Sequence, residues 1–289
     1  MSDTFYSSAN AKEEILNIYH EKLDELKIEY EFVKAQTSFG ETNVISTGNS
    51  QKPPIILIHG SNGCAPIALE AMMLLLEHFK VYAIDIVGQP NLSAETRPNL
   101  KDTSYGKWVN EILEKLNLNE VIIAGASFGG FICLKTLVTD ETRIKKTFLI
   151  VPAGIVDGNP LKAIFKIFIP MKLYMWTKNT KYLRSFLETL FTEEDTFALN
   201  FLSKVFLHFK MDFTLIPKIS DEEANNIKTP VYVVGADTDV FFPGIKMIER
   251  SKKIFRTMPE TLLLENTKHV PNKAVNKKIA SFIIENSFE

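Results

Sequence analysis

The sequence predicts an α/β protein built on a mostly parallel sheet. Short apolar runs of the kind that form buried strands recur along the 289-residue chain and alternate with segments of helical periodicity. Because two parallel strands need a long crossover connection, this alternation indicates βαβ units with helices on both faces of one sheet. Hydrophobic residues make up 45% of the chain and charged residues 24%, which is ordinary for a globular domain.

The first third of the chain combines a helix, a hairpin and the first strand of buried character. Apolar residues at helical spacing among charged ones predict an amphipathic helix over 11–27. Two short strands, 29–38 and 42–47, are expected to form a hairpin because a glycine separates them. The run 55–58 is wholly apolar, as in parallel strands that are covered on both faces, and a helix is expected over 66–79.

The middle of the chain continues the strand and helix alternation. We expect a strand over 81–84, a helix over 105–116 and a strand over 121–124, which ends in a glycine-rich turn. A helical apolar stretch, 131–138, follows that turn, and the next strand is expected over 146–151. These spacings suit βαβ units of a single sheet.

From 153 to 224 the alternation stops. Phenylalanines and lysines are interspersed there in segments of helical character. We interpret 153–224 as a helical insertion between two strands of one sheet, so that the core comprises 1–152 and 225–289, with 1–28 as an N-terminal helix and arm. After the insertion, we expect a strand over 230–235, a strand over 261–264 and a final helix over 273–285.

The most informative motif is Gly125-Ala126-Ser127-Phe128-Gly129, which lies between an expected strand and an expected helix. A G-x-S-x-G pattern in this context is typical of a nucleophile elbow, a strained turn that exposes a serine hydroxyl. The residues two before and two after the serine lie too close to neighbouring backbone to carry side chains, and both are glycine here. Ser127 is therefore the expected nucleophile.

A serine hydroxyl needs a base, and the base needs a carboxylate that orients it. Of the five histidines, His269 alone follows the last expected strand by a few residues, where it could reach Ser127. The order serine, acid, histidine suits this topology and makes Asp239 or Asp237 the acid. We favour Asp239 because an apolar run follows it, whereas Asp237 could cap its own turn.

Acyl transfer also needs backbone donors for the oxyanion of its tetrahedral intermediate. The N–H of Phe128 is one candidate because it begins the helix after Ser127 and benefits from that helix's dipole. The second candidate is the N–H of Ser61, in the loop His59-Gly60-Ser61 that follows the strand 55–58.

With these motifs in place, the chain resembles capped, esterase-like members of the α/β-hydrolase fold superfamily from about residue 29 onward. The resemblance implies an eight-stranded, mostly parallel sheet with a helical cap inserted after strand six. Two features differ from the pattern common in this superfamily. The catalytic histidine there often follows a glycine, whereas Lys268 precedes His269. The loop after Asp85 reads Gly88-Gln89-Pro90 and lacks the second glycine that is often found in it. The residues that carry the resemblance are His59-Gly60, Asp85-Ile86-Val87-Gly88, Gly125 to Gly129, Asp239 to Pro243 and His269.

The resemblance and the motifs together predict a serine hydrolase that cleaves a carboxylic ester of a small, apolar substrate through an acyl-enzyme. The same residues would also suit a thioesterase, a lactonase or a carbon–carbon bond hydrolase. A ligand-binding protein of this fold that turns over slowly is a further alternative. So is a lipid-surface enzyme, because 162–176 mixes lysine with phenylalanine, isoleucine and tryptophan.

Composition restricts the partners and the compartment. The net charge of −2 gives no field that would attract nucleic acid or an anionic membrane, and the two cysteines have no metal-ligand spacing. We therefore expect no metal, no organic cofactor and no stable membrane insertion, while a homodimer stays open. The polar start of the sequence lacks the apolar core of a signal peptide, so a cytoplasmic location is expected.

Overall fold

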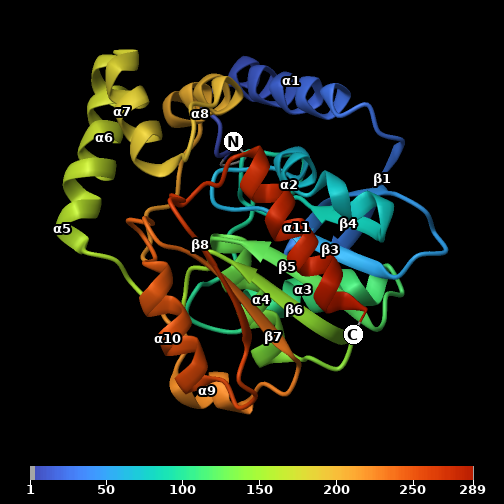
Figure 1. The fold of residues 1–289 in the computed structure, drawn as a ribbon. Helices are drawn as coiled ribbons and strands as arrows, with labels where there is room; N and C mark the ends of the chain where they lie inside the picture. The colour runs from blue at the N-terminus through green and yellow to red at the C-terminus, as the bar shows by residue number, and fades with distance from the viewer. Residues whose placement is uncertain (1–3, 289) are drawn as a thin grey trace.

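An eight-stranded sheet in the order β1-β2-β4-β3-β5-β6-β7-β8 runs through the protein (Figure 1). The computed structural model describes residues 4–288, so that 1–3 and 289 of the predicted core lie outside the described part. The strands are β1 (Tyr30–Thr37), β2 (Gly40–Thr47), β3 (Pro54–Ile58), β4 (Lys80–Ile84), β5 (Val121–Ala126), β6 (Ile144–Ile150), β7 (Val231–Ala236) and β8 (Glu260–Leu264).

The helices connect the strands and cover the sheet. They are α1 (Ala9–Glu25), α2 (Ala65–Ala71), the 3-10 turn η1 (Met73–Glu77), α3 (Ser104–Lys115), α4 (Phe128–Thr139), α5 (Pro160–Ala163), the π-helical turn η2 (Ile164–Phe168), α6 (Ile169–Thr177), α7 (Thr180–Leu190), α8 (Thr196–His208), α9 (Asp221–Asn226), α10 (Gly244–Ile254) and α11 (Lys273–Ser287).

The sheet is mostly parallel, as the sequence predicts. From β4 through β3, β5, β6 and β7 to β8, every neighbouring pair is parallel. The β1–β2 hairpin and the β2–β4 pair are antiparallel and form one edge. The central strands are almost entirely apolar because helices cover both of their faces.

Alternate residues of each strand face two separate hydrophobic cores. On β3, Ile55 and Leu57 belong to a core that is closed by α2, η1, α11 and the helices between β6 and β7. Ile56 and Ile58 face the other core, in which α3, α4 and α10 supply the buried side chains, including the fully buried Trp108. The helices that connect parallel strands thus pack on both faces of the sheet, which confirms the predicted α/β layering.

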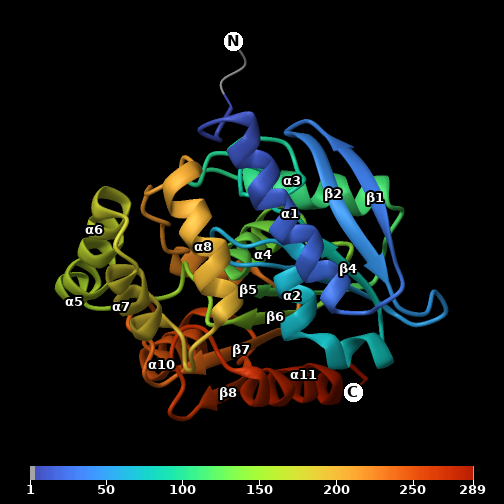
Figure 2. The ribbon, with the colours of Figure 1, turned by 90° about the horizontal axis from the view of Figure 1, so that it is seen from above.

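Helices α5 to α8 lie between β6 and β7, where the sequence places the insertion. Both Figure 1 and Figure 2 place α5, α6 and α7 at the outer edge of the molecule, beside the sheet layers. Helix α8 packs along α1, which joins the inserted helices to the N-terminal helix. The predicted boundary at 224 falls inside α9, a short helix that packs on α4 and α10.

Two helices differ clearly from their predicted bounds, and a third was not predicted. The helix predicted over 66–79 ends at Ala71 and continues as the 3-10 turn η1, and α4 begins at Phe128, three residues earlier than predicted. Helix α10 was not predicted at all. It starts at Gly244 without a side-chain cap, so the sequence offers no helix-start signal.

Candidate active site

Ser127 lies in the turn between β5 and α4 with a backbone φ of 52° and ψ of −112°. A positive φ is uncommon outside glycine, and such strain persists only where the surroundings hold it. The surroundings here are hydrogen bonds: the Ser127 N–H donates to the Ile150 carbonyl at 2.9 Å, and its own carbonyl accepts from Ala153 N at 3.0 Å. The strained conformation projects the hydroxyl from the end of the strand.

Close backbone packing explains the two glycines of the motif. A Cβ on Gly129 would lie 2.2 Å from the Ile58 carbonyl oxygen, and one on Gly125 would lie 2.3 Å from the Gly129 carbonyl oxygen. Neither distance is tolerable, and both contacts are to backbone that cannot move aside. The turn can therefore form only with glycine at these positions, as the motif predicts.

The structure brings Ser127, His269 and Asp239 into one hydrogen-bonded chain. The Nε2 atom of His269 lies 2.9 Å from the Ser127 Oγ, and its Nδ1 lies 2.7 Å from Asp239 Oδ2. Both His269 and Asp239 are buried. Asp239 is fixed in turn, since its Oδ1 accepts hydrogen bonds from the N–H groups of Phe241 and Phe242.

Asp237, the alternative acid, has a different set of partners. Its carboxylate accepts hydrogen bonds from the backbone N–H groups of Asn266 and Thr267, at 3.0 and 3.1 Å. It thereby connects the loop after β7 to the loop after β8, which carries His269. The structure thus places Asp239 at the imidazole and Asp237 at the base of the neighbouring loop.

The two residues predicted to supply oxyanion donors, Phe128 and Ser61, belong to segments that adjoin Ser127. Phe128 is the first residue of α4, so its N–H has no acceptor within the helix. A Cβ on Gly60 would lie 3.5 Å from the Ser127 Cβ, which places the loop that contains Ser61 against the serine. Ser61 is exposed and lines the same cavity as Ser127.

Two residues for which the sequence predicts no role of their own in the site, His59 and Gln89, hold this loop in place. His59 is buried, its Nδ1 lies 2.7 Å from the Gly60 carbonyl oxygen, and its Nε2 accepts from Ile86 N at 3.0 Å. Burial lowers the pKa of His59 to about 4, which keeps the ring neutral and suits it to this pair of bonds. Gln89 adds a hydrogen bond from Asn62 N to its side-chain oxygen at 2.7 Å.

Ser127 and His269 line a cavity of about 1680 Å³, whereas Asp239 is buried behind the imidazole. Its walls come from the sheet edge, from α1 and α2, and from the inserted helices. The apolar part of the wall includes Ile67, Ile164, Ile167, Phe197, Phe201 and Leu215. Lys22 contributes a buried charge to this wall, where its Nζ lies 2.9 Å from Glu25 and 3.3 Å from Glu70.

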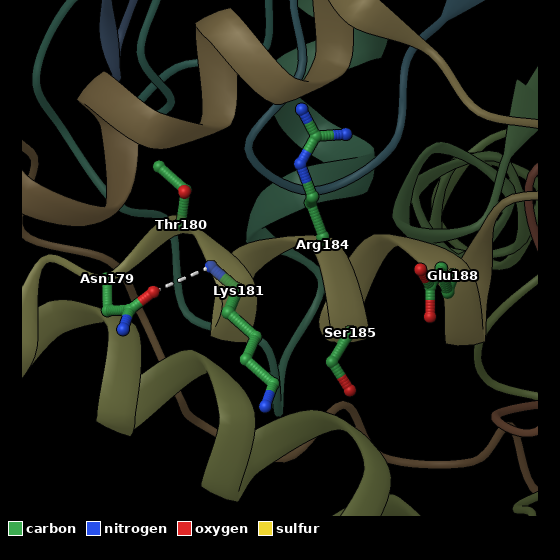
Figure 3. Close-up of a pocket in the computed structure, with 6 residues that line it drawn as sticks. All are labelled: Asn179, Thr180, Lys181, Arg184, Ser185 and Glu188. Atoms are coloured by element: carbon green, nitrogen blue, oxygen red, sulfur yellow. Dashed lines mark hydrogen bonds between the residues drawn. The ribbon is translucent and has the colours of Figure 1, made fainter.

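A smaller hollow of about 460 Å³ lies along α7 (Figure 3). Its lining is polar and includes Lys181, Arg184 and Glu188. The one interaction drawn there is the helix cap, in which Asn179 accepts from Lys181 N. Among the described residues, none of the site residues predicted from the sequence lines this hollow, and we assign no function to it.

Comparison with known proteins identifies the fold. A family described as "alpha/beta hydrolase fold" matches residues 53–185. The crystal structure of naproxen esterase (carboxylesterase NP) from Bacillus subtilis superposes with a TM-score of 0.81, covering 96% of this chain and 99% of that one at 18% identity. The protein has the α/β-hydrolase fold.

This α/β-hydrolase-fold chain also resembles two carboxylesterase-named proteins of Bacillus subtilis in sequence. It is 27% identical to Carboxylesterase YbfK over 135 residues, which are 47% of this chain and 46% of that protein. It is 26% identical to Uncharacterized carboxylesterase nap over 135 residues, 47% and 45% of the respective chains. The aligned stretch thus spans about half the length of these relatives.

Two absences among the described residues 4–288 concern membrane-spanning helices and metal sites. No helix in that range is long and apolar enough to cross a bilayer. No group of three or more His, Cys, Asp or Glu side chains in the same range is arranged to hold a metal ion.

Proposed function

We propose that this protein is a serine carboxylesterase that works through an acyl-enzyme. The observation that carries the proposal is the hydrogen-bonded chain from Ser127 through His269 to Asp239 at the wall of a large cavity. The resemblance to carboxylesterase-named proteins supports the same reaction class.

In the proposed first step, the Ser127 Oγ attacks the ester carbonyl while His269 Nε2 takes the hydroxyl proton. Asp239 holds the imidazole in the tautomer with the proton on Nδ1 and stabilises the imidazolium that forms. The imidazolium then gives its proton to the leaving alcohol, and the serine ester remains. Water, deprotonated by the same imidazole, releases the acid and restores the free serine.

The developing negative charge on the carbonyl oxygen would be met by the N–H groups of Phe128 and Ser61. The Phe128 donor lies at the positive end of the twelve-residue helix α4, which adds favourable electrostatics. The second donor depends on the loop that His59 and Gln89 hold in place. Both donors are preorganised, so little reorganisation is needed when charge develops.

The cavity favours an ester with an apolar part of some length. Its volume of about 1680 Å³ exceeds the roughly 300–1,000 Å³ of ordinary ligand pockets. Phe197, Phe201 and the isoleucines of the inserted helices would contact such a group. We propose that these helices act as a cap over the site and set the acyl preference.

The proposal is tested with a series of p-nitrophenyl esters of increasing acyl length and the variant Ser127→Ala. We expect turnover that rises with acyl length up to a limit set by the cavity, and a loss of about 10⁶ in kcat for the variant. Ser61→Ala serves as a matched control, since it removes a hydroxyl at the site but keeps the proposed N–H donor. Turnover that survives in Ser127→Ala would overturn the proposal, and hydrolysis confined to thioesters, lactones or diketones would redirect it.

A further inference from the structure

The outer face of the inserted helices carries exposed apolar and basic side chains together. Helices α5 and α6 are continuous through η2, and Leu161, Phe165, Ile169 and Trp176 are exposed along them. Their positions differ by four, four and seven residues, which places them in one stripe along a helix. Trp176 is 82% exposed and Phe165 is 66% exposed. We call these four residues the outer stripe.

The opposite side of the same helix is already occupied. Ile167, Met171 and Tyr174 are buried and belong to the core that also contains α7 and α8. No member of the outer stripe lines the cavity, which this helix lines with Pro160, Ala163, Ile164, Ile167, Phe168 and Met171. A partner therefore cannot wrap around the helix, and the outer stripe offers only one face.

The charge of this segment differs from that of the whole chain. Between Asp157 and Glu188 the sequence has six basic residues and no acidic one, although the whole chain has a net charge of −2. Lys162, Lys166 and Lys172 are exposed beside the outer stripe, and in the described part of the chain no ion pair engages these three. Lysines that flank an exposed apolar stripe are typical of helices that lie in the interface of an anionic membrane.

The cavity opens next to this face. Ile164 is both exposed and part of the cavity wall, and Leu215, 84% exposed, also belongs to that wall. Lys172 places its Nζ 4.3 Å from the ring centroid of Phe213, another residue of the wall, which joins the lysine to the cavity rim. An apolar molecule leaving a lipid phase at this face would therefore meet the cavity without crossing the protein.

We propose that the outer stripe and its lysines dock the protein peripherally on the surface of an anionic lipid bilayer. The docking itself stands independently of the reaction. Its consequence, that the site receives apolar esters from the lipid phase, rests on the proposed function. The stripe would insert only to the level of the headgroups, because its length and its lysines suit an interfacial rather than a spanning position.

The test measures binding of the full-length protein to vesicles of phosphatidylcholine alone and of phosphatidylcholine with an equal part of phosphatidylglycerol. Trp176 is a built-in reporter, since the only other tryptophan, Trp108, is fully buried. We expect cosedimentation with the anionic vesicles only, weakening as salt rises, together with a shift of tryptophan emission to shorter wavelength. The shift should be absent in Trp176→Phe.

Two variants and two matched controls separate docking from general effects. Lys162→Glu with Lys166→Glu, and separately Phe165→Ser, should each lower the vesicle partition coefficient about tenfold or more. Lys252→Glu with Lys253→Glu, on α10, and Met258→Ser, at another exposed apolar site, should leave it unchanged. All four proteins should hydrolyse a soluble short-chain ester as the wild type does, because none of these residues lines the described cavity.

Absence of wild-type binding to the anionic vesicles would overturn the docking proposal, as would equal binding by the variants and their controls. A wild-type dimer that Phe165→Ser converts to a monomer, with no vesicle binding, would show that a second copy covers the face instead. Ser127→Ala should bind vesicles like the wild type. If vesicles bind but no ester is turned over, the docking stands and the proposed function fails.

Discussion

His269 Nε2 lies 2.9 Å from the Ser127 Oγ across a sequence separation of 142 residues. The serine is positioned by a strained turn after β5, and the histidine by the loop after β8, which Asp237 ties to the loop after β7. Because β5 and β8 are parallel strands of one sheet, their carboxyl ends meet at the same edge. The fold itself thus produces the contact on which the proposed chemistry depends.

The two candidate acids should differ sharply in their effect on turnover. Asp239→Asn should lower kcat about 10⁴-fold, because an amide cannot stabilise the imidazolium and favours the wrong tautomer. Asp237→Asn should keep kcat within about tenfold of wild type, since Asp237 accepts only backbone bonds from the adjacent loop. Steady-state kinetics with one activated ester measures both. The opposite ranking would show that the acid has been misassigned.

The turn should not accept a methyl group at Gly129. Gly129→Ala places a Cβ 2.2 Å from the Ile58 carbonyl oxygen, so the free energy of unfolding should fall by about 3 kcal/mol or more. Gly60→Ala is the matched control, because its Cβ would have only ordinary contacts at 3.5 Å. Thermal and urea unfolding of both variants provide the comparison. Equal stability of the two would contradict the backbone packing described for the turn.

His59 should make the protein less stable in acid. Its pKa is about 4 when folded and about 6.5 when unfolded, so the unfolded chain binds more protons between these values. The stabilising contribution is complete above pH 6.5 and disappears as the pH falls to 4. At about 1.4 kcal/mol for each tenfold change in proton affinity, it amounts to about 3 kcal/mol.

Asp85 should oppose that trend. Burial raises its pKa from 3.8 to about 6, although Ala65 N, Asn43 and Tyr19 all donate hydrogen bonds to it. The folded protein therefore binds the extra proton between pH 3.8 and 6, and stability contributed by Asp85 increases as the pH falls through that window. The two buried groups should nearly cancel in the wild type.

Substitution should reveal each contribution separately. In Asp85→Asn, the free energy of unfolding should fall more steeply between pH 6 and 4 than in the wild type, because only the His59 effect remains. In His59→Gln, the free energy of unfolding should rise relative to the wild type as the pH falls from 6 to 4, because only the Asp85 effect remains. Urea unfolding across this pH range compares the slopes, and other titrating groups cancel in the comparison. Identical slopes in all three proteins would refute the assigned protonation states.

Much of the fold could be predicted because its strands are short apolar runs that are bounded by turn residues. The elements that could not be predicted depend on tertiary contacts. Helix α10 begins at Gly244, although glycine has a low helix propensity. Glycine is needed there because the helix start packs closely on β7, where a Cβ would lie 2.6 Å from Ala236 N. Gly129 and Gly130 likewise lower the helix propensity of the first turn of α4. The predicted start of this helix, at residue 131, is therefore three residues too late.

The candidate site was predictable in its residue types but less so in its support. The order of Ser127, Asp239 and His269 follows from the topology, and the structure brings these three together. The roles of His59 and Gln89 depend on hydrogen bonds between separate loops, which leave no spacing pattern in the sequence. The π-helical turn between α5 and α6 could not be predicted either, because no residue propensity distinguishes it from an α-helix.

The most direct test of the central claim is to treat the folded protein with a fluorophosphonate and locate the adduct by peptide mass spectrometry. Activation of Ser127 by His269 predicts a single adduct on Ser127, none in Ser127→Ala, and labelling slowed by several orders of magnitude in His269→Ala. The far-ultraviolet circular dichroism of each protein verifies that it is folded. Failure of the folded wild type to react, or labelling that is unchanged in His269→Ala, would contradict the account.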